Sequence, residues 1–461
     1  MRVYVETYGC WLNKADSMIM ITLLLRRGFR VVPSVEDADI VILNTCAVRG
    51  DSEVRQLKRM RELYSKYPDK IFIVAGCLAK VRISEIRRIF EGKCIIVGPN
   101  DVESIDLIVD HALREGRRIF LSDDRPMKML PEHLPEMTGH IYVAPLQVGC
   151  LCSCTFCVTR YARDVKGRVR SYPIELIVDA VKRAVERGAR EIYLTGQDVA
   201  CYGFDRGYTL VDLLERLLRE VDREDIFIRI GMSEPEAFSK IVDQLLDIVK
   251  RDRRVYRYFH IPVQSGSDRI LSLMRRKYTV DEYRELVRKI RREIPESTIV
   301  TDMIVGFPGE TEEDFEKSLD LIRELEFDKV HVARFSPRPF TEAEVMREQV
   351  PDRVKKIRSR KMVEVANEVS LRRNLRYVCG RYRGIVSSLD QKGQGVVVRL
   401  ENYKPVIVKE VSADLLSAIV EVHVTDASPI NLVGTIENIH VEPLHVTGQA
   451  IVKEELVEDA S

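Results

Sequence analysis

Long apolar stretches are absent from this sequence. Across its 461 residues, no run approaches the roughly 20 consecutive apolar residues that a membrane-spanning helix needs. The N-terminal segment MRVYVETYGC alternates like a β-strand and lacks the apolar core of a secretory signal. An excess of either charge is also absent: the formal net charge is +1, so overall charge does not indicate a nucleic-acid partner. These absences predict a cytoplasmic protein without a membrane segment.

Cysteine, by contrast, is abundant, with ten residues in the chain. Thiols stay reduced in the cytoplasm, so a framework of disulfides is not expected. The cysteines are therefore expected to be metal ligands, catalytic thiols or members of the core. Hydrophobic residues make up 45% of the chain, which is sufficient for packed cores.

The length predicts roughly three domains, and the pattern of the sequence changes accordingly. Residues 1–125 alternate apolar strands with helices, which predicts a parallel α/β domain covered on both faces. Residues 140–345 contain six strand candidates separated by amphipathic helices, which predicts a partial (β/α)6 barrel. A basic helical connector follows at 346–376. Short β-branched segments at 377–440 predict a small antiparallel β-barrel, and 441–461 form an acidic tail. The predicted fold class is α/β.

The strongest motif is GCLCSCTFC, in which Cys150, Cys154 and Cys157 have C-x3-C-x2-C spacing. A loop with these gaps can place three thiolates around one corner of an iron–sulfur cubane. One iron of a four-iron cluster would stay open, and it could chelate S-adenosylmethionine (SAM) for radical cleavage. The loop follows the first barrel strand, where barrel active sites lie. The alternative is a zinc knuckle or a structural thiol-rich loop. We interpret Cys152, inside the loop, as a bystander.

Three further cysteines, Cys10, Cys46 and Cys77, each end a predicted parallel strand in the N-terminal domain. Neighbouring strands place such ends side by side, at the crevice where open α/β sheets bind ligands. Any one of these thiols alone is explained as well by core packing. Three at matching strand ends favour a cluster site. Cys94 opens its strand at the opposite edge and is expected to be a buried small residue.

Polar residues and glycines follow the later barrel strands and predict a rim that binds SAM. A carboxylate after the second strand would pair with the ammonium group of SAM, and glycines permit close backbone approach. Each of these residues taken singly could instead cap a loop. The candidates are Gln197 and Asp198 after the second strand, Ser233 and Glu234 after the third, Gln264 after the fourth and Gly306 after the fifth.

Local charge is more informative than the net value. Clusters of Lys and Arg follow the cysteine loop and the fourth barrel strand and continue through the connector. They could neutralise phosphates, or they could be helix faces paired with nearby acids. Small barrels like the C-terminal one commonly bind RNA through loops and one face, and Tyr403 and Arg399 are candidate contacts there.

These motifs together resemble the radical SAM superfamily and its methylthiotransferase branch, with the C-terminal zone similar to a TRAM domain. The region CTFCVTRYAR…RSYP resembles the archaeal and eukaryotic branch that acts on N6-threonylcarbamoyladenosine of tRNA. The sequence departs from that branch by its extra Cys152. The other segments that carry the resemblance are TYGCWLNKADS from Thr7, NTCAV from Asn44, AGC from Ala75, IPVQSGSDRILSLMRRKYT from Ile261, DMIVGFPGET from Asp302 and FSPRPFT from Phe335.

The resemblance implies two [4Fe–4S] clusters, one on the central cysteine loop and an auxiliary one on Cys10, Cys46 and Cys77. It implies a SAM-dependent enzyme that adds a methylthio group to a tRNA anticodon loop and needs an electron donor and a sulfur donor. We expect a monomer. The nearest alternatives are another tRNA adenosine or a ribosomal protein side chain as the substrate. A more distant alternative is a non-catalytic RNA-binding or electron-transfer protein.

Overall fold

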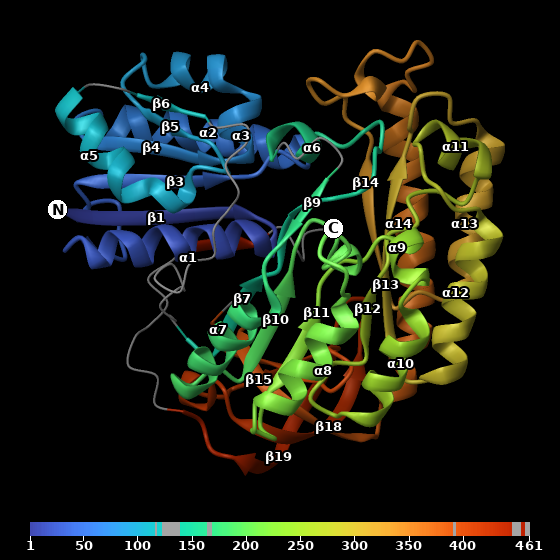
Figure 1. Ribbon diagram of the computed structural model, residues 1–461. Coiled ribbons are helices and arrows are strands. Elements are labelled where there is room, and N and C mark those ends of the chain that lie inside the picture. The colour runs from blue at the N-terminus through green and yellow to red at the C-terminus, as the bar shows by residue number, and fades with distance from the viewer. Residues whose placement is uncertain (116–117, 122–138, 164–167, 391–392, 445–452, 457–461) are drawn as a thin grey trace.

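The computed structural model describes the chain except for residues 116–117, 122–138, 164–167, 391–392, 445–452 and 457–461 (Figure 1). The acidic tail predicted for 441–461 therefore lies largely outside the described residues. Within the described part, no helix has both the length and the apolar character needed to cross a membrane.

The N-terminal part is a fully parallel sheet with strand order β2-β1-β3-β4-β5-β6, and the short strand β20 also pairs with β1. Side chains alternate between two cores: Ile40 and Ile42 point to one face and Val41 and Leu43 to the other. Helices cover both faces, which confirms the predicted α/β layering. The strands are β1 (Arg2–Gly9), β2 (Arg30–Val31), β3 (Ile40–Thr45), β4 (Ile71–Gly76), β5 (Ile95–Val97), β6 (Ile119–Phe120) and β20 (Lys453–Leu456). The helices are α1 (Trp11–Arg26), α2 (Gly50–Lys66), α3 (Cys77–Val81), α4 (Ile83–Ile89) and α5 (Ile105–Glu115).

The central part has the six predicted parallel strands, arranged as β7-β10-β11 and β12-β13-β14. A parallel bridge between Ile228 and Val255 connects the two halves, which gives the predicted partial barrel. The strands are β7 (Ile141–Pro145), β10 (Glu191–Thr195), β11 (Phe227–Ile230), β12 (Tyr258–His260), β13 (Thr298–Val305) and β14 (Lys329–Arg334). The helices are α6 (Thr159–Ala162), α7 (Ile174–Glu186), α8 (Leu210–Glu220), α9 (Pro235–Ser239), α10 (Val242–Arg251), α11 (Asp268–Leu273), α12 (Val280–Glu293) and α13 (Glu312–Leu325).

The first barrel strand is shorter than the apolar run 141–150 predicts. The chain leaves the parallel sheet after Pro145, and the next residues form β8 (Gln147–Gly149), which pairs antiparallel with β9 (Val169–Ser171). This hairpin encloses the cysteine loop, so the loop is anchored on both sides.

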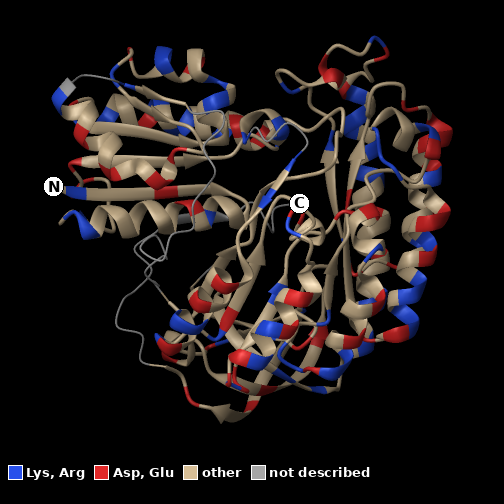
Figure 2. Ribbon diagram, viewed as in Figure 1, with Lys and Arg blue, Asp and Glu red and all other residues tan. Residues whose placement is uncertain are grey.

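Basic and acidic residues are interspersed along the outer helices (Figure 2). Arg288 on α12, for example, pairs with Glu324 on α13 at 2.7 Å. The connector forms the long helix α14 (Asp352–Asn374), which packs against α13 and β14. Its Arg358 pairs with Glu310 at 2.9 Å. Much of the connector charge is therefore neutralised within the chain, as the alternative to phosphate binding predicts.

The C-terminal part is a closed five-stranded barrel with order β15-β16-β17-β19-β18. Its pairs are antiparallel as predicted, apart from β17 and β19, which run parallel. Tyr403, a candidate RNA contact, is buried against Tyr193, Tyr256 and Tyr258 of the central barrel and does not lie on the outer surface of the C-terminal barrel. The strands are β15 (Arg381–Leu389), β16 (Gly395–Leu400), β17 (Pro405–Lys409), β18 (Ile419–Ala427) and β19 (Leu432–Val441).

A single buried carboxylate, Asp328, joins the central barrel, α14 and the C-terminal barrel. It lies 2.6 Å from Arg291 of α12, 2.8 Å from Arg373 of α14 and 2.8 Å from Lys404. Burial by itself would raise the pKa of Asp328, but these three cations hold its pKa below the ordinary range. The ionised carboxylate therefore stabilises the fold near neutral pH, and this stabilisation is lost as the pH falls through its lowered pKa.

We expect Asp328→Asn to lower the free energy of unfolding by about 3–5 kcal/mol, because it leaves buried cations uncompensated. The matched control is Asp320→Asn, since Asp320 is an exposed aspartate on α13 that pairs with Arg323 three residues away. It should cost less than about 0.5 kcal/mol. Urea denaturation at pH 7 measures both, and equal losses would contradict the proposed role of Asp328.

Candidate active site

Cys10, Cys46 and Cys77 follow β1, β3 and β4, which are neighbours in the sheet. The structure brings their thiols together at one edge. Burial, followed by the nearby Cys10 and Cys77 thiols, raises the pKa of Cys46 to about 12. Cys10 is exposed while Cys46 and Cys77 are buried, so the group opens toward one side. Cys94 lies apart in the core, as predicted.

Two glycines make this approach of the thiols possible. Gly9 has φ +97°, and a Cβ atom there would lie 2.5 Å from Cβ and 2.8 Å from Sγ of Cys46. Gly76 has φ +90°, and its Cβ would collide with the carbonyl of Thr45. L-residues rarely adopt such φ values, so glycine is required before both Cys10 and Cys77.

Asparagine side chains fix the ends of these strands. Asn13 Nδ2 donates hydrogen bonds to the carbonyls of Tyr8 and Thr45, each at 2.8 Å. Asn44 Nδ2 donates to Ser17 Oγ at 2.8 Å. Asn44 Oδ1 is buried and has no hydrogen-bond partner among the described residues. Three thiol ligands in a rigid, partly polar cradle are the donor set that an iron–sulfur cluster requires.

The loop between β8 and α6 carries the second group of thiols. Cys154 Sγ accepts a hydrogen bond from Arg276 Nη1 at 3.2 Å, and Cys150 Sγ accepts one from the Cys152 N–H at 3.4 Å. The Cys157 N–H donates to the carbonyl of Cys154 at 3.2 Å. N–H donors on the sulfurs favour thiolate ligands. Cys152 lies close to Cys150, so the structure does not separate the extra thiol from the group.

Asp198 is the rim residue with an acceptor available for a ligand. Its Oδ1 accepts the N–H groups of Ala200 and Glu234 at 3.2 and 2.9 Å. Its Oδ2 is buried without a partner in the part of the chain that the structure describes. Burial raises the pKa of Asp198 to about 7. An ammonium group such as that of SAM would supply the missing donor, so this site suits the predicted cofactor.

The other rim candidates have partners within the chain. Gln197 Oε1 accepts the Gly149 N–H at 2.5 Å and so braces the cysteine loop. The carboxylate of Glu234 caps α9 and pairs with Arg276 at 3.1 Å. Ser233 is buried, with Oγ 3.4 Å from the carbonyl of Gly231.

Two rim candidates have left-handed backbone, Gln264 at φ +73° and Gly306 at φ +74°. Gln264 lines the central cavity. A Cβ at Gly306 would collide with the stem of Lys355, so this glycine accommodates α14 and does not by itself indicate a cofactor contact.

One cavity of ≈ 2060 Å³ connects the two groups of thiols, because both Cys10 and Cys157 line it. Residues of all three parts of the chain contribute to its wall, including Asp390 and Lys409 of the C-terminal barrel. Twelve of the described lining residues are Lys or Arg and six are Asp or Glu. The cavity is therefore basic, although the whole chain carries a formal net charge of only +1.

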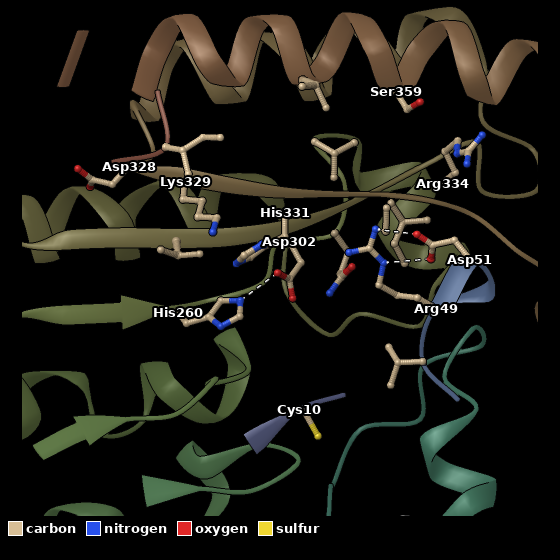
Figure 3. Close-up of a pocket in the computed structure, with 18 of the residues that line it drawn as sticks. Cys10, Arg49, Asp51, His260, Asp302, Asp328, Lys329, His331, Arg334 and Ser359 are labelled. Carbon is tan, nitrogen blue, oxygen red and sulfur yellow. Dashed lines mark hydrogen bonds and ion pairs between the residues drawn. The ribbon is translucent and has the colours of Figure 1, made fainter. Parts of the chain in front are cut away.

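His260, Asp302 and His331 project into this cavity from adjacent strands β12, β13 and β14 (Figure 3). His260 Nε2 lies 2.9 Å from Asp302 Oδ1, and the two histidine rings are 5.5 Å apart. Burial alone would raise the pKa of Asp302, but His260 and then His331 hold it below its ordinary value. Sequence reasoning missed this layer. The signal that could have revealed it is a polar residue, such as Asp302, at a position of an otherwise apolar strand that faces the inside of the barrel.

Family models match two regions of the chain. A model described as the Radical SAM superfamily matches residues 145–322, and one described as uncharacterized protein family UPF0004 matches residues 2–98. A solved radical S-adenosylmethionine methyltransferase, TsrM from Kitasatospora setae, aligns with a TM-score of 0.53 at 15% identity over 75% of each chain. The barrel and its cysteine loop are thus those of a radical SAM protein.

Named relatives of the chain indicate which kind of radical SAM protein it is. A Pyrococcus horikoshii protein named probable threonylcarbamoyladenosine tRNA methylthiotransferase is 38% identical over 412 residues, 89% of this chain and 94% of its own. A Methanocaldococcus jannaschii protein of the same name is 36% identical over 94% of this chain and 96% of its own. A Bacillus subtilis tRNA-2-methylthio-N(6)-dimethylallyladenosine synthase is 35% identical over 82% and 74%. The chain belongs to the radical SAM methylthiotransferase family, as the motifs predict.

We expect Gly9→Ala to be more harmful than Gly28→Ala. Both glycines have positive φ, but a Cβ at Gly28 meets nothing within 4 Å. Backbone strain of about 1–3 kcal/mol is therefore common to both variants, whereas only Gly9→Ala displaces Cys46. Urea denaturation should show the larger loss for Gly9→Ala, and iron analysis after reconstitution should show less iron per chain. Equal behaviour of the two variants would mean that the contact with Cys46 is unimportant.

Proposed function

We propose that this chain is a tRNA methylthiotransferase that converts N6-threonylcarbamoyladenosine next to the anticodon into its 2-methylthio derivative. The observation that carries this proposal is the single basic cavity onto which both groups of cysteines open. An enzyme that inserts sulfur needs its sulfur-bearing site and its radical-generating site to face one substrate atom. Cys10 and Cys157 on the wall of one cavity meet this requirement.

In this proposal, Cys150, Cys154 and Cys157 hold one [4Fe–4S] cluster, and Cys10, Cys46 and Cys77 hold the other. When bound, the clusters and SAM supply the electron, the carbon-centred radical and the sulfur and methyl groups. Asp198 orients SAM by accepting from its ammonium group. The reaction requires an electron donor and a sulfur donor as partners, and we expect the enzyme to act as a cytoplasmic monomer.

The basic lining suits an RNA substrate. Lys and Arg side chains from the barrel, α14 and the C-terminal barrel would neutralise phosphates around the cavity. A target base must leave its stack to enter such a cavity. In an anticodon loop the cost of extruding a base is low, because the loop is single-stranded.

The His260–Asp302–His331 layer supports the threonylcarbamoyl substrate. This group carries a carboxylate, a hydroxyl and N–H groups, whereas a dimethylallyl group is apolar. The histidines can donate hydrogen bonds to the carboxylate or carbonyl oxygens, and Asp302 can accept from an N–H group. The names of the archaeal relatives agree with this choice.

Nucleoside mass spectrometry of tRNA tests the proposal. Reconstituted protein with SAM, sulfide and dithionite is expected to form 2-methylthio-N6-threonylcarbamoyladenosine. Cys77→Ala should abolish this product while 5′-deoxyadenosine still accumulates. Cys94→Ala is the matched control, because Cys94 is a buried thiol of the same domain that precedes β5 and lies at the opposite edge from the carboxyl ends of the strands. Methylthiolation of another adenosine or of a ribosomal protein would mean that the proposed substrate is wrong. A wild-type yield of product from Cys77→Ala would mean that the proposed auxiliary cluster site is wrong.

We expect His331→Leu to weaken recognition of the threonylcarbamoyl group. The Kd ratio between tRNA lacking and tRNA carrying this group should fall by about 10-fold, since a hydrogen bond to a charged group contributes about 1.5–3 kcal/mol. His111→Leu, on the exposed side of α5, should leave the ratio unchanged. A ratio unaffected by His331→Leu would place the side chain of the modified base elsewhere in the cavity.

A further inference from the structure

Arg163 is a fully buried arginine between the two groups of cysteines. It follows α6, the short helix that begins two residues after Cys157, and its side chain is only 1% exposed. Val158 and Ala162, at the start and end of this segment, belong to the core of the N-terminal sheet, together with Cys77. The loop that leaves the central cysteines therefore inserts into the domain that carries the other three.

The guanidinium is held by polar groups of the helix that follows Cys10. Arg163 Nη2 donates to Asn13 Oδ1 at 2.9 Å and to Asp16 Oδ2 at 2.5 Å. The backbone carbonyl of Arg163 accepts from Asn100 Nδ2 at 3.2 Å. Side chain and backbone are thus both fixed. A buried charge of this kind costs several kcal/mol unless its surroundings compensate it.

The compensation by protein groups is incomplete. Arg163 Nη1 and Asp16 Oδ1 are both buried without a hydrogen-bond partner among the residues that the structure describes. The thiols of Cys77 and Cys10 are close enough to interact electrostatically with the guanidinium. The side chain that has an unused N–H donor therefore lies beside sulfur atoms, which accept hydrogen bonds when ionised or bound to iron.

We propose that Arg163 is a positioning residue for the auxiliary cysteine site: it balances the negative charge of the Cys10, Cys46 and Cys77 thiolates and donates an N–H group to sulfur. This inference rests on the proposed auxiliary cluster. Net charge and hydrogen bonds to sulfur set the reduction potential of an iron–sulfur cluster. A cation beside the cluster stabilises its more negative, reduced state and so raises the potential. Arg163 thereby connects the loop of one cysteine group to the redox properties of the other.

A simpler explanation is that Arg163 only holds the two domains together through its ion pair with Asp16. The two explanations differ in what they predict for the reduction potential of the auxiliary cluster. An ion pair that only joins the domains affects the stability of the fold. A charge beside the cluster also changes the midpoint potential of the cluster, even in a fully folded protein. The experiment must therefore remove Arg163 without leaving Asp16 as an isolated buried carboxylate.

The test compares Asp16→Asn with the double variant Asp16→Asn/Arg163→Met in reconstituted full-length protein. Only the guanidinium differs between them, and the double variant leaves no unpaired buried charge at this position. Iron analysis and EPR-monitored redox titration are made with SAM present, so that the cluster that binds SAM is distinguished from the auxiliary one. Arg163→Lys, which keeps a charge but loses the planar fork, is titrated in parallel. Arg59→Met serves as the control, because Arg59 also pairs with a buried carboxylate of this sheet, Glu6 on β1, although Arg59 itself is partly exposed.

We expect the auxiliary potential to be more negative in the double variant than in Asp16→Asn, with the SAM-binding cluster unchanged. Arg163→Lys should shift it less, and Arg59→Met should not shift it. Equal auxiliary potentials in Asp16→Asn and the double variant would overturn the inference. Should the double variant fail to fold, a potential in Arg163→Lys identical to wild type with full iron content would also overturn the N–H···S contact. Iron for only one cluster in the wild-type protein would instead overturn the proposed function, and this inference with it.

Discussion

Two buried arginines hold the N-terminal sheet against the open side of the barrel. Arg163 follows α6, in the segment after the cysteine loop, and pairs with Asp16 on α1. Arg338 follows the last barrel strand, pairs with Glu53 on α2 and donates to the carbonyl of Ala47 at 2.7 Å. Both guanidiniums are nearly inaccessible, so losing its carboxylate partner would leave either arginine as a buried charge, at a cost of about 3–5 kcal/mol. These pairs fix the sheet relative to the barrel and thereby determine which part of the lumen the three N-terminal cysteines face.

The other end of the lumen depends on a different contact. Arg229 of β11 lies over the rings of Tyr193, Tyr258 and Tyr403, with distances of 5.4, 4.9 and 5.0 Å to their centroids. Tyr403 belongs to the C-terminal barrel, which therefore closes the amino ends of the barrel strands. A cation surrounded by aromatic rings is stabilised by the negative faces of those rings. The C-terminal barrel therefore forms the floor of the cavity and contributes Arg399, Lys404 and Lys409 to its wall.

Local patterns in the sequence were sufficient for much of this architecture. Alternating burial along β3 and the spacing of Cys150, Cys154 and Cys157 are properties of short segments, and so the sheets and the cysteine loop could be predicted. Contacts between distant segments could not. His331 reaches Asp302 only because β13 and β14 pair in one particular register. The burial of Tyr403 likewise depends on how one domain docks on another. The β8–β9 hairpin escaped prediction because an apolar run does not reveal where a strand changes its partner.

The same electrostatic arrangement occurs at both groups of thiols. Arg276 donates to Cys154 Sγ at 3.2 Å and is neutralised by Glu234 at 3.1 Å, while Arg163 lies beside Cys77 and is neutralised by Asp16. Three thiolates in a poorly hydrated pocket repel one another strongly, so a nearby cation favours their ionised, metal-binding form. The carboxylate has a complementary effect, because it keeps the arginine paired while the thiols are still neutral. In the proposed function, each pocket would therefore keep its arginine paired before a cluster binds. Such an arrangement explains why the arginines come from elements next to the cysteine sites and not from the solvent-facing basic residues of α14.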